Sequence, residues 1–287
     1  MEKIGKVHSI WRYPVKGMAG EIVKSAEFSS SGIAGDRMMA VQDVARREIQ
    51  SCKFRPQLLQ CRAEYADTDD VTAPIRVSFP DGETLETTDP GINQKISSLL
   101  GHDSVLQAVR PASDREFYRR YKNDAHTWLD ELKATFAREP GEPLPDLDNL
   151  PEEAQEFVSL RGSFFLVSPL HIISTASITH LRQLNPDANW DLERFRPNLV
   201  VETLPEFTGL VEQHWVGYGL RIGDISIRCS EPAPRCGAVT QQQQNLDRDT
   251  SLLRTIVKEA DQNLGIYGDI QNSGRINTGD EIFLERI

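Results

Sequence analysis

The sequence has few cysteines, no long hydrophobic run and fewer basic than acidic residues. Its 287 residues include 32 lysines and arginines against 43 aspartates and glutamates, a formal net charge of -11. Such a chain lacks the basic surface that binding along a nucleic-acid backbone requires, so no nucleic-acid partner is expected. No segment approaches the roughly 18 apolar residues of a membrane-spanning helix. The N-terminal segment also lacks the apolar region of a secretory signal, so we expect a cytoplasmic location.

Signatures of common enzyme classes are missing as well. The four cysteines are too widely spaced for a CxxC motif or for the iron–sulfur spacing of plant-type ferredoxins. The six histidines include no HExxH pair, and there is no GxSxG elbow, P-loop or Rossmann glycine motif. Common hydrolase and nucleotide-dependent activities therefore have no motif to support them. In a reducing cytoplasm all four thiols are expected to stay free.

Short alternating segments separated by turns predict an α+β protein that is mainly β. The closely spaced strands of the first hundred residues favour a barrel or a sandwich. They are predicted at residues 3–12, 21–28, 37–43, 58–65, 75–79 and 83–87. Further strands are predicted at residues 198–202, 220–222, 225–229 and 282–285.

Helical spacing of apolar residues appears at four places. The predicted helices cover residues 89–101, 125–138, 174–185 and 249–260. The first has Pro90 at its start and Gly101 at its end, and the third has Ser174 or Thr175 as its cap. In the second we expect Trp128, Leu129, Leu132 and Phe136 to face inward. Residues 139–153, rich in proline and acids, predict a surface loop.

Cys236 is the cysteine whose surroundings suggest chemistry. It follows a predicted strand in the segment Pro234-Arg235-Cys236-Gly237, where Arg235 can stabilise a thiolate and Gly237 allows close backbone approach. A reactive or metal-binding cysteine and an incidental loop cysteine are both compatible with this pattern. Cys52, Cys61 and Cys229 lie in or beside strand-like segments, and we interpret them as structural thiols.

Four further segments combine turns with basic or small polar residues, at residues 13–17, 35–37, 174–177 and 194–198. Each alone is typical of solvated cations or a helix cap. Together they would suit a small phosphorylated ligand.

Taken in order along the chain, these segments resemble the MOSC family. Tyr-Pro-Val-Lys-Gly at 13–17 and Gly-Ile-Ala-Gly-Asp-Arg at 32–37 resemble the N-terminal β-barrel domain that accompanies many MOSC domains. Arg-Phe-Arg-Pro-Asn at 194–198, Pro-Arg-Cys at 234–236 and the tail from residue 264 to 280 resemble the MOSC domain itself. The resemblance implies an N-terminal β-barrel-like domain over residues 1–115. It implies a MOSC β-barrel domain with peripheral helices over residues 116–287.

The resemblance also implies a molybdenum–molybdopterin cofactor, with Cys236 as the catalytic thiolate ligand of the metal. The residues implied to contact the cofactor are Lys16, Arg37, Ser177, Arg196, Asn198, Arg235 and Tyr267. Gly17 stands where some relatives carry a serine. The ferredoxin-like domain of some bacterial relatives is absent, so a separate ferredoxin- or cytochrome b5-like electron donor is implied. Binding of pyridoxal phosphate is attributed to the family as a whole.

Three functions follow as hypotheses. The first is a molybdenum oxidoreductase that removes oxygen from N-hydroxylated or related N-oxygenated small molecules, as the amidoxime-reducing relatives do. The second is a sulfur carrier that uses a persulfide on Cys236. The third is a cofactor-binding protein without catalysis.

Overall fold

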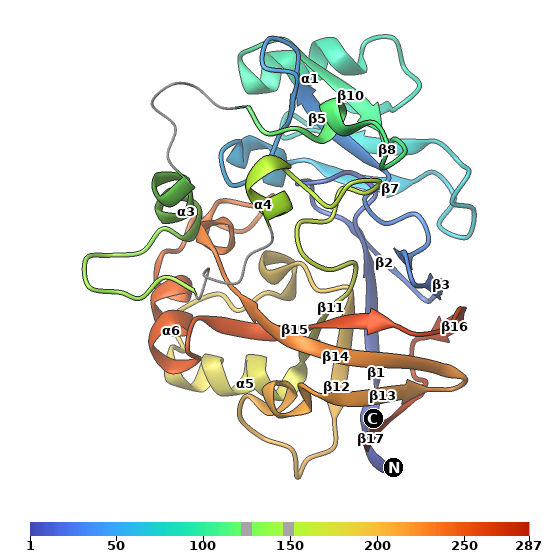
Figure 1. Cartoon of the computed structure of the whole chain (residues 1–287), viewed down its shortest axis with the longest axis vertical. Coiled ribbons are helices and arrows are strands. Elements are labelled where there is room, and N and C mark those ends of the chain that lie inside the picture. Colours follow the sequence, from blue (N-terminus) through green and yellow to red (C-terminus); the bar gives the residue numbers. More distant parts are fainter. Residues whose placement is uncertain (122–127, 146–151, 287) are drawn as a thin grey trace.

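A computed structural model describes residues 1–121, 128–145 and 152–286 (Figure 1). Seven of the strands in these ranges form a closed barrel, in the order β12-β11-β15-β14-β13-β17-β1, with a further β1–β12 pairing that completes the ring. The barrel strands are β1 (Glu2–Arg12), β11 (His171–Ser174), β12 (Leu199–Thr203), β13 (Tyr218–Ile222), β14 (Ile225–Pro234), β15 (Asn263–Ile270) and β17 (Glu281–Arg286).

Alternation of apolar and polar residues directs the barrel strands toward one core. In β1, Ile4 and Val7 are buried while Lys6 is exposed. In β14, Ile225, Ile227 and Cys229 share the inward face, as the strand period predicts. The expectation that Cys229 is a buried structural thiol is therefore confirmed.

Residues 13–108, together with β16, form smaller sheets outside the barrel. β2 (Glu21–Val23) extends the barrel sheet beyond β1, and three three-stranded sheets follow. Their members are β3 (Ser25–Ser29), β4 (Gly32–Ile33) and β16 (Gly274–Asn277); β5 (Met39–Asp43), β6 (Glu48–Ile49) and β10 (Ser104–Ala108); and β7 (Arg62–Tyr65), β8 (Ile75–Ser78) and β9 (Thr84–Glu86). A second core, which includes Met18, Leu58 and Ile96, fills this part, and the fully buried Cys61 belongs to it.

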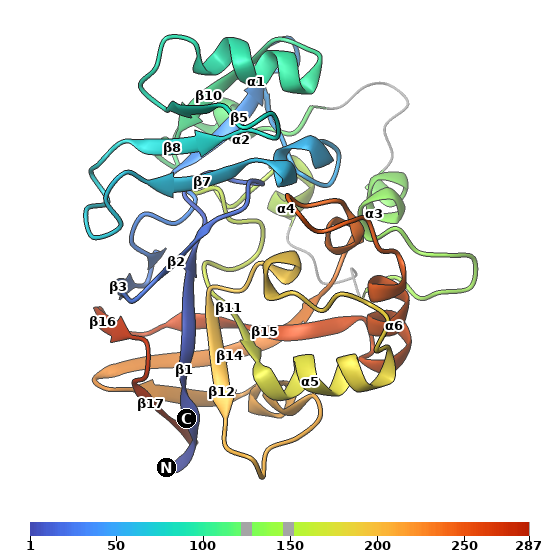
Figure 2. The ribbon, with the colours of Figure 1, turned by 180° about the vertical axis from the view of Figure 1, so that it is seen from behind.

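Helices lie at the periphery of both parts (Figures 1 and 2). The α-helices are α1 (Ile92–Leu100), α2 (Arg115–Tyr118), α3 (Trp128–Phe136), α4 (Glu152–Glu156), α5 (Thr175–Leu184) and α6 (Ser251–Glu259). The 3-10 helices are η1 (Pro56–Gln60), η2 (Leu192–Phe195), η3 (Val211–Trp215) and η4 (Gly237–Thr240). None of the helices in the described ranges has the length and apolar character that crossing a bilayer demands. The mainly β, α+β class is confirmed.

Several predicted elements need correction. The strand expected at residues 58–65 begins as η1, because Pro56 starts a 3-10 turn and the adjacent Leu58 and Leu59 are both buried, which no alternating strand allows. The strand expected at residues 21–28 divides at Lys24 into β2 and β3, which pair with different partners. Residues 122–127 and 146–151 lie outside the described residues. The side chains of Trp128, Leu129 and Leu132 lie outside them as well. Most of the predicted inward face of α3 and part of the predicted surface loop at residues 139–153 therefore fall outside the described residues.

Helix ends agree with the capping residues. α1 ends at Gly101, whose φ of 76° is the left-handed conformation of a glycine cap. α5 begins after Ser174, whose hydroxyl accepts a hydrogen bond from the amide of Ser177 at 3.1 Å. The domain boundary expected between residues 115 and 116 stays a prediction. β1 belongs to the predicted N-terminal domain, yet it completes the barrel formed by strands of the predicted MOSC domain.

Gly5 lies where β1 is held between two neighbours. It pairs with Thr203 of β12 on one side and with Ile282 of β17 on the other. A Cβ atom at this position would overlap the carbonyl oxygen of Glu202.

We therefore expect Gly5→Ala to lower the free energy of unfolding by roughly 2–3 kcal/mol, because an overpacked position forces the backbone to shift. Gly279→Ala, at a turn with a φ of 93° and open space around the position, is the control. It should cost about 1 kcal/mol from backbone strain alone. Denaturant unfolding measures both values, and equal losses would contradict the argument.

Candidate functional site

A cavity of about 920 Å³ lies between the barrel and the N-terminal sheets. Its walls come from the turn after β1, the segment after β6, the loop that precedes β11, the end of β14 and the middle of β15. Nine lysines and arginines line it against four glutamates, among the residues that the structure describes. A chain of net charge -11 thus carries a locally positive cavity, which favours an anionic ligand.

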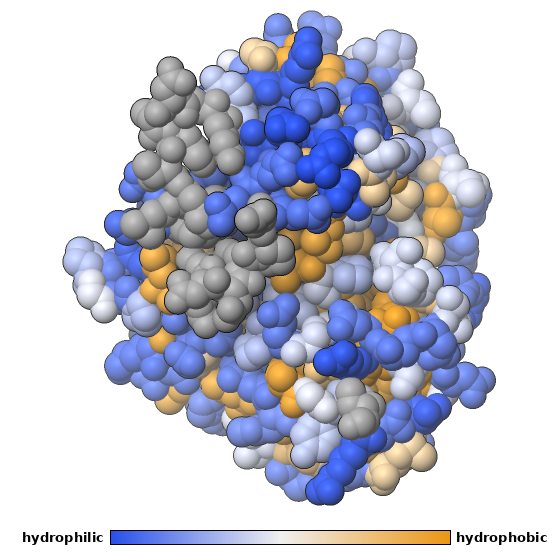
Figure 3. All heavy atoms as spheres, in the orientation of Figure 1, coloured by the Kyte–Doolittle hydropathy of each residue, from blue (hydrophilic) through white to orange (hydrophobic). Residues whose placement is uncertain are grey.

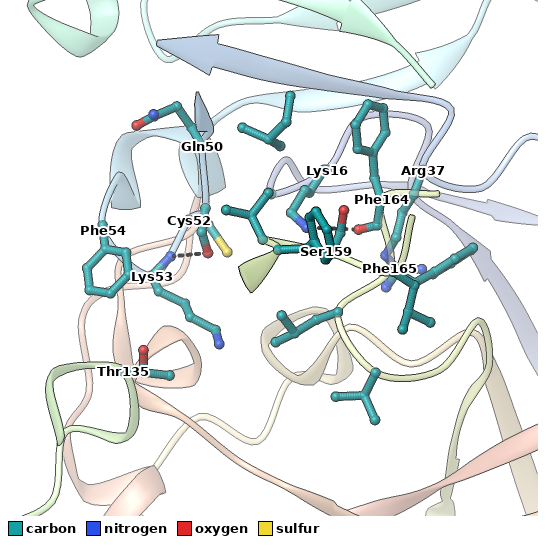
Figure 4. Close-up of a pocket in the computed structure, with 18 of the residues that line it drawn as sticks. Lys16, Arg37, Gln50, Cys52, Lys53, Phe54, Thr135, Ser159, Phe164 and Phe165 are labelled. Carbon is teal, nitrogen blue, oxygen red and sulfur yellow. Dashed lines mark hydrogen bonds between the residues drawn. The ribbon is translucent and has the colours of Figure 1, made fainter. Parts of the chain in front are cut away.

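Lys16 enters this cavity from the turn after Pro14 (Figure 4). Its backbone amide bonds to the carbonyl of Met39 at 2.8 Å, and its Nζ donates to the carbonyl of Phe164 at 2.9 Å. Burial, together with the charges of Lys53 and Arg37, lowers the pKa of Lys16 to about 7. The ammonium group of Lys16 is therefore only partly protonated near neutral pH, and a bound anion would stabilise its charged form.

Arg37 is positioned by its neighbour Asp36. Its φ of 52° lies in the left-handed region, and its guanidinium forms an ion pair with the buried Asp36 carboxylate. The same carboxylate accepts bonds from the amide of Tyr13 at 2.7 Å and from Nδ2 of Asn198 at 2.9 Å. Burial raises the pKa of Asp36, while these donors and Arg37 oppose the rise. The guanidinium also lies over the ring of Phe165, at 5.2 Å.

Arg196 and Asn198 come from the turn between η2 and β12. Arg196 has a φ of 54°, donates to the carbonyl of Met18, and lies 4.2 Å from the centre of the Tyr13 ring. The Asn198 amide group is engaged by Asp36 and by backbone groups, so it acts mainly as a brace of the cavity wall.

Arg235 lies at the end of β14 with Tyr267 and His171 beside it in the cavity wall. Its guanidinium donates to the carbonyl of Phe195 at 2.7 Å and lies 3.3 Å from Nε2 of His171. Its buried Nε atom has no hydrogen-bond partner within the described part of the chain. A buried donor without a partner in a cavity wall indicates that a ligand atom completes it.

Cys236 follows Arg235 directly and precedes η4. It is partly exposed, and its backbone is extended, with φ of -117°. Cys236 does not itself line the cavity, but Pro234 and Arg235 before it do. Burial raises the pKa values of Cys52 and Tyr267, and the charge of Cys236 adds to the rise in both, which places it in electrostatic range of two cavity residues.

Ser177 is the one expected site residue that lies elsewhere. It is fully buried in the first turn of α5, where its hydroxyl donates to the carboxylate of Glu212. It does not line the cavity in the described structure. The structure therefore brings together Lys16, Arg37, Arg196, Asn198, Arg235 and Tyr267, with Cys236 next to them.

The cavity residues that the sequence did not predict include three with side chains that could take part in chemistry: Cys52, Lys53 and His171. Cys52 and Lys53 line the cavity from the segment after β6, although Cys52 had been interpreted as structural (Figure 4). A Cβ on Gly17 would lie 3.4 Å from the Cβ of Cys52, so this segment covers the glycine closely. The third is His171, which sits at the start of an unpredicted strand. Cys52 and Lys53 form a cysteine–cation pair after a strand, as Arg235 and Cys236 do. This likeness is the sequence signal that could have predicted their place in the cavity.

Models of two domains match the chain. The MOSC N-terminal beta barrel domain matches residues 4–132, and the MOSC domain matches residues 160–283. The chain belongs to the MOSC family. Among the described residues, no group of three or more His, Cys, Asp and Glu side chains is placed to hold a metal ion.

Similar proteins share the full length of this MOSC chain. Mitochondrial amidoxime reducing component 2 from Bos taurus is 23% identical, over 99% of this chain and 84% of its own. The protein of the same name from Homo sapiens is 22% identical over the same shares. Among solved structures, the YuaD protein from Bacillus subtilis matches with a TM-score of 0.43 and 13% identity, over 99% of this chain and 97% of its own.

We expect the buried imidazole of His171 to make stability depend on pH. Burial and the neighbouring Arg235 lower the pKa of His171 to about 3, so the folded ring stays neutral while the unfolded ring takes up a proton below about pH 6.5. Its contribution to stability is thus present above pH 6.5 and is lost as the pH falls toward 3. Between pH 7 and pH 5 the loss should be about 2 kcal/mol.

The test compares the wild type with His171→Gln by denaturant unfolding at both pH values. The variant should be less stable at pH 7, and its loss of stability on acidification should be smaller by about 2 kcal/mol. An identical acid-induced loss in both proteins would show that His171 does not titrate as argued.

Proposed function

We propose that this protein is a molybdenum-cofactor oxidoreductase that reduces N-hydroxylated or related N-oxygenated small molecules. The observation that carries the proposal is the gathering of six expected cofactor residues in one cation-rich cavity beside Cys236. The two relatives named as amidoxime reducing components support the reaction class, since they align over nearly the whole chain.

The residues present fit a phosphorylated pterin. We call Lys16, Arg37, Arg196 and Arg235 the cationic wall. Lys16 and Arg37 would hold the phosphate. Among the described residues the Nζ of Lys16 donates to a carbonyl and forms no ion pair, and the turns around Pro14 and Asp36 bring both cations to the cavity. Arg235 would offer its unpartnered Nε to the cofactor, and Tyr267 adds a hydroxyl to the same wall.

Cys236 would be the protein's single thiolate ligand. Thiolate is a soft ligand suited to molybdenum, and Cys236 is partly exposed and directly follows Arg235 of the cavity wall. When bound, the cofactor supplies the oxygen-abstracting redox chemistry. The balanced reaction takes an N–OH group, two electrons and two protons to N–H and water. A separate ferredoxin- or cytochrome b5-like protein would deliver the electrons.

The protein's own groups would bind and orient the cofactor and exclude water from it. The cationic wall would neutralise the phosphate charge, and the rings of Tyr13 and Phe165 each lie 5.2 Å from the guanidinium of Arg37, which they help to position. Ser177 has no part in this proposal, because its hydroxyl is used by Glu212. The cytoplasmic location stays a prediction.

The first experiment measures molybdenum and pterin in protein purified from a cofactor-competent host. Wild-type protein should contain both, and Cys236→Ser should lose most of the metal because the thiolate ligand is gone. Ser177→Ala is the control: it should keep the metal and lose about 1–2 kcal/mol of stability, since a buried hydrogen bond to Glu212 disappears.

Wild-type protein with no more metal than Cys236→Ser would overturn the proposal. Metal-free protein that gains the mass of one sulfur atom on Cys236 from a cysteine desulfurase would instead favour the sulfur carrier. Stable metal-free protein with neither property would favour the binding protein without catalysis.

The lowered pKa of Lys16 gives a second test, with sulfate as a phosphate-like probe whose charge is constant near neutral pH. Lys16 is charged below about pH 7 and loses its charge above it, so sulfate should raise the melting temperature more at pH 6 than at pH 8.5. Lys16→Arg keeps its charge throughout and should flatten this dependence. An equal pH dependence in both proteins would remove Lys16 from the anion site.

A further inference from the structure

The mouth of the cavity is apolar where its wall is cationic. Four large hydrophobic residues that line the cavity are exposed, although such side chains usually avoid water: Phe54 at 43%, Leu160 at 46%, Leu166 at 48% and Val167 at 42%. We call these four the apolar rim. In Figure 3 apolar side chains gather in the hollow on this face of the molecule. Exposed apolar residues concentrated at one cavity indicate a binding surface.

One loop connects the apolar rim to the cationic wall. Phe164 is fully buried and its carbonyl accepts the bond from Lys16, and the buried ring of Phe165 lies against Arg37 (Figure 4). The next two residues, Leu166 and Val167, are the exposed ones. The loop therefore passes from the anion-binding residues to the mouth within four positions.

The loop holds this arrangement by its own hydrogen bonds. The amide of Leu160 donates to the carbonyl of Phe165 at 2.9 Å, and the amide of Ser163 donates to the carbonyl of Leu160 at 3.1 Å. Gly162, with a φ of 80°, turns the loop against Ala112. The exposed Leu160 thus belongs to a hydrogen-bonded turn over residues 160–165, and Leu166 directly follows that turn.

We propose that the apolar rim is a substrate subsite that holds an alkyl or aryl body, so that the preferred substrates are N-oxygenated compounds with an extended apolar group. This inference rests on the proposed function for the reacting group, but the subsite itself binds apolar groups whether or not turnover occurs. The N-oxygenated head of such a substrate points toward the cofactor that the cationic wall would hold, and its apolar body lies along Leu166 and Val167. Phe54, from the segment after β6, contributes a further apolar surface to the same cavity.

The test uses straight-chain alkyl amidoximes from propyl to octyl, with the amides of the same chain lengths as ligands that have no N–O bond. Full burial of a methylene corresponds to about fourfold in affinity, and a half-exposed rim should give about twofold per methylene. We expect kcat/KM for the amidoximes, and the affinity of the amides by titration calorimetry, to rise by that factor. The gain should appear in KM, with kcat little changed.

The double variant Leu166→Ser/Val167→Ser should flatten both series, and its melting temperature should stay near that of the wild type because both side chains are half exposed. Leu184→Ser is the matched control, since Leu184 is 48% exposed at the end of α5 and does not line the cavity in the described structure. It should leave both series unchanged.

A flat amide series in the wild type overturns the subsite, as does a Leu184→Ser variant that flattens the series as much as the double variant. A rising amide series without turnover of any amidoxime supports the subsite and overturns the proposed function.

Discussion

The buried carboxylate of Asp36 holds together the three chain segments on which the cavity depends. It accepts hydrogen bonds from the amide of Tyr13, at the end of β1, and from the side chain of Asn198, before β12, and it pairs with Arg37. These partners come from the N-terminal segment and from the second half of the sequence, and so from both structural parts. A buried charge is tolerated only when it is fully paired, so the carboxylate fixes both backbone turns and the direction of Arg37.

The positive cavity has a cost that the fold itself bears. Burial disfavours the charged form of Lys16, and the neighbouring cations disfavour it further. Arg235 keeps a buried donor without a partner among the described residues. Like charges brought together out of water are unfavourable until an opposite charge arrives, so the same features that weaken the free protein strengthen its hold on an anion.

Local patterns in the sequence predicted much of the secondary structure, and resemblance predicted most of the site. The glycine cap of α1 and the serine cap of α5 are short-range signals, and the structure confirms both. The place of β1 between β12 and β17 depends on pairing across almost the whole chain, which no local pattern encodes. The positions of Cys52 in the cavity and of Ser177 outside it were both missed for the same reason. Cys52 packs against Gly17 and Ser177 bonds to Glu212, and each of these partners is more than 30 residues away along the chain.

The first and last strands of the barrel are neighbours, and both ends of the chain emerge at the same place (Figures 1 and 2). A ring whose seam joins residue 2 to residue 284 can close only after the chain has been synthesised as far as residue 284. Such distant contacts make folding slow and leave unpaired edges open in the meantime. The same adjacency makes the molecule a natural candidate for circular permutation, in which the old ends are joined and new ones are opened at an exposed turn.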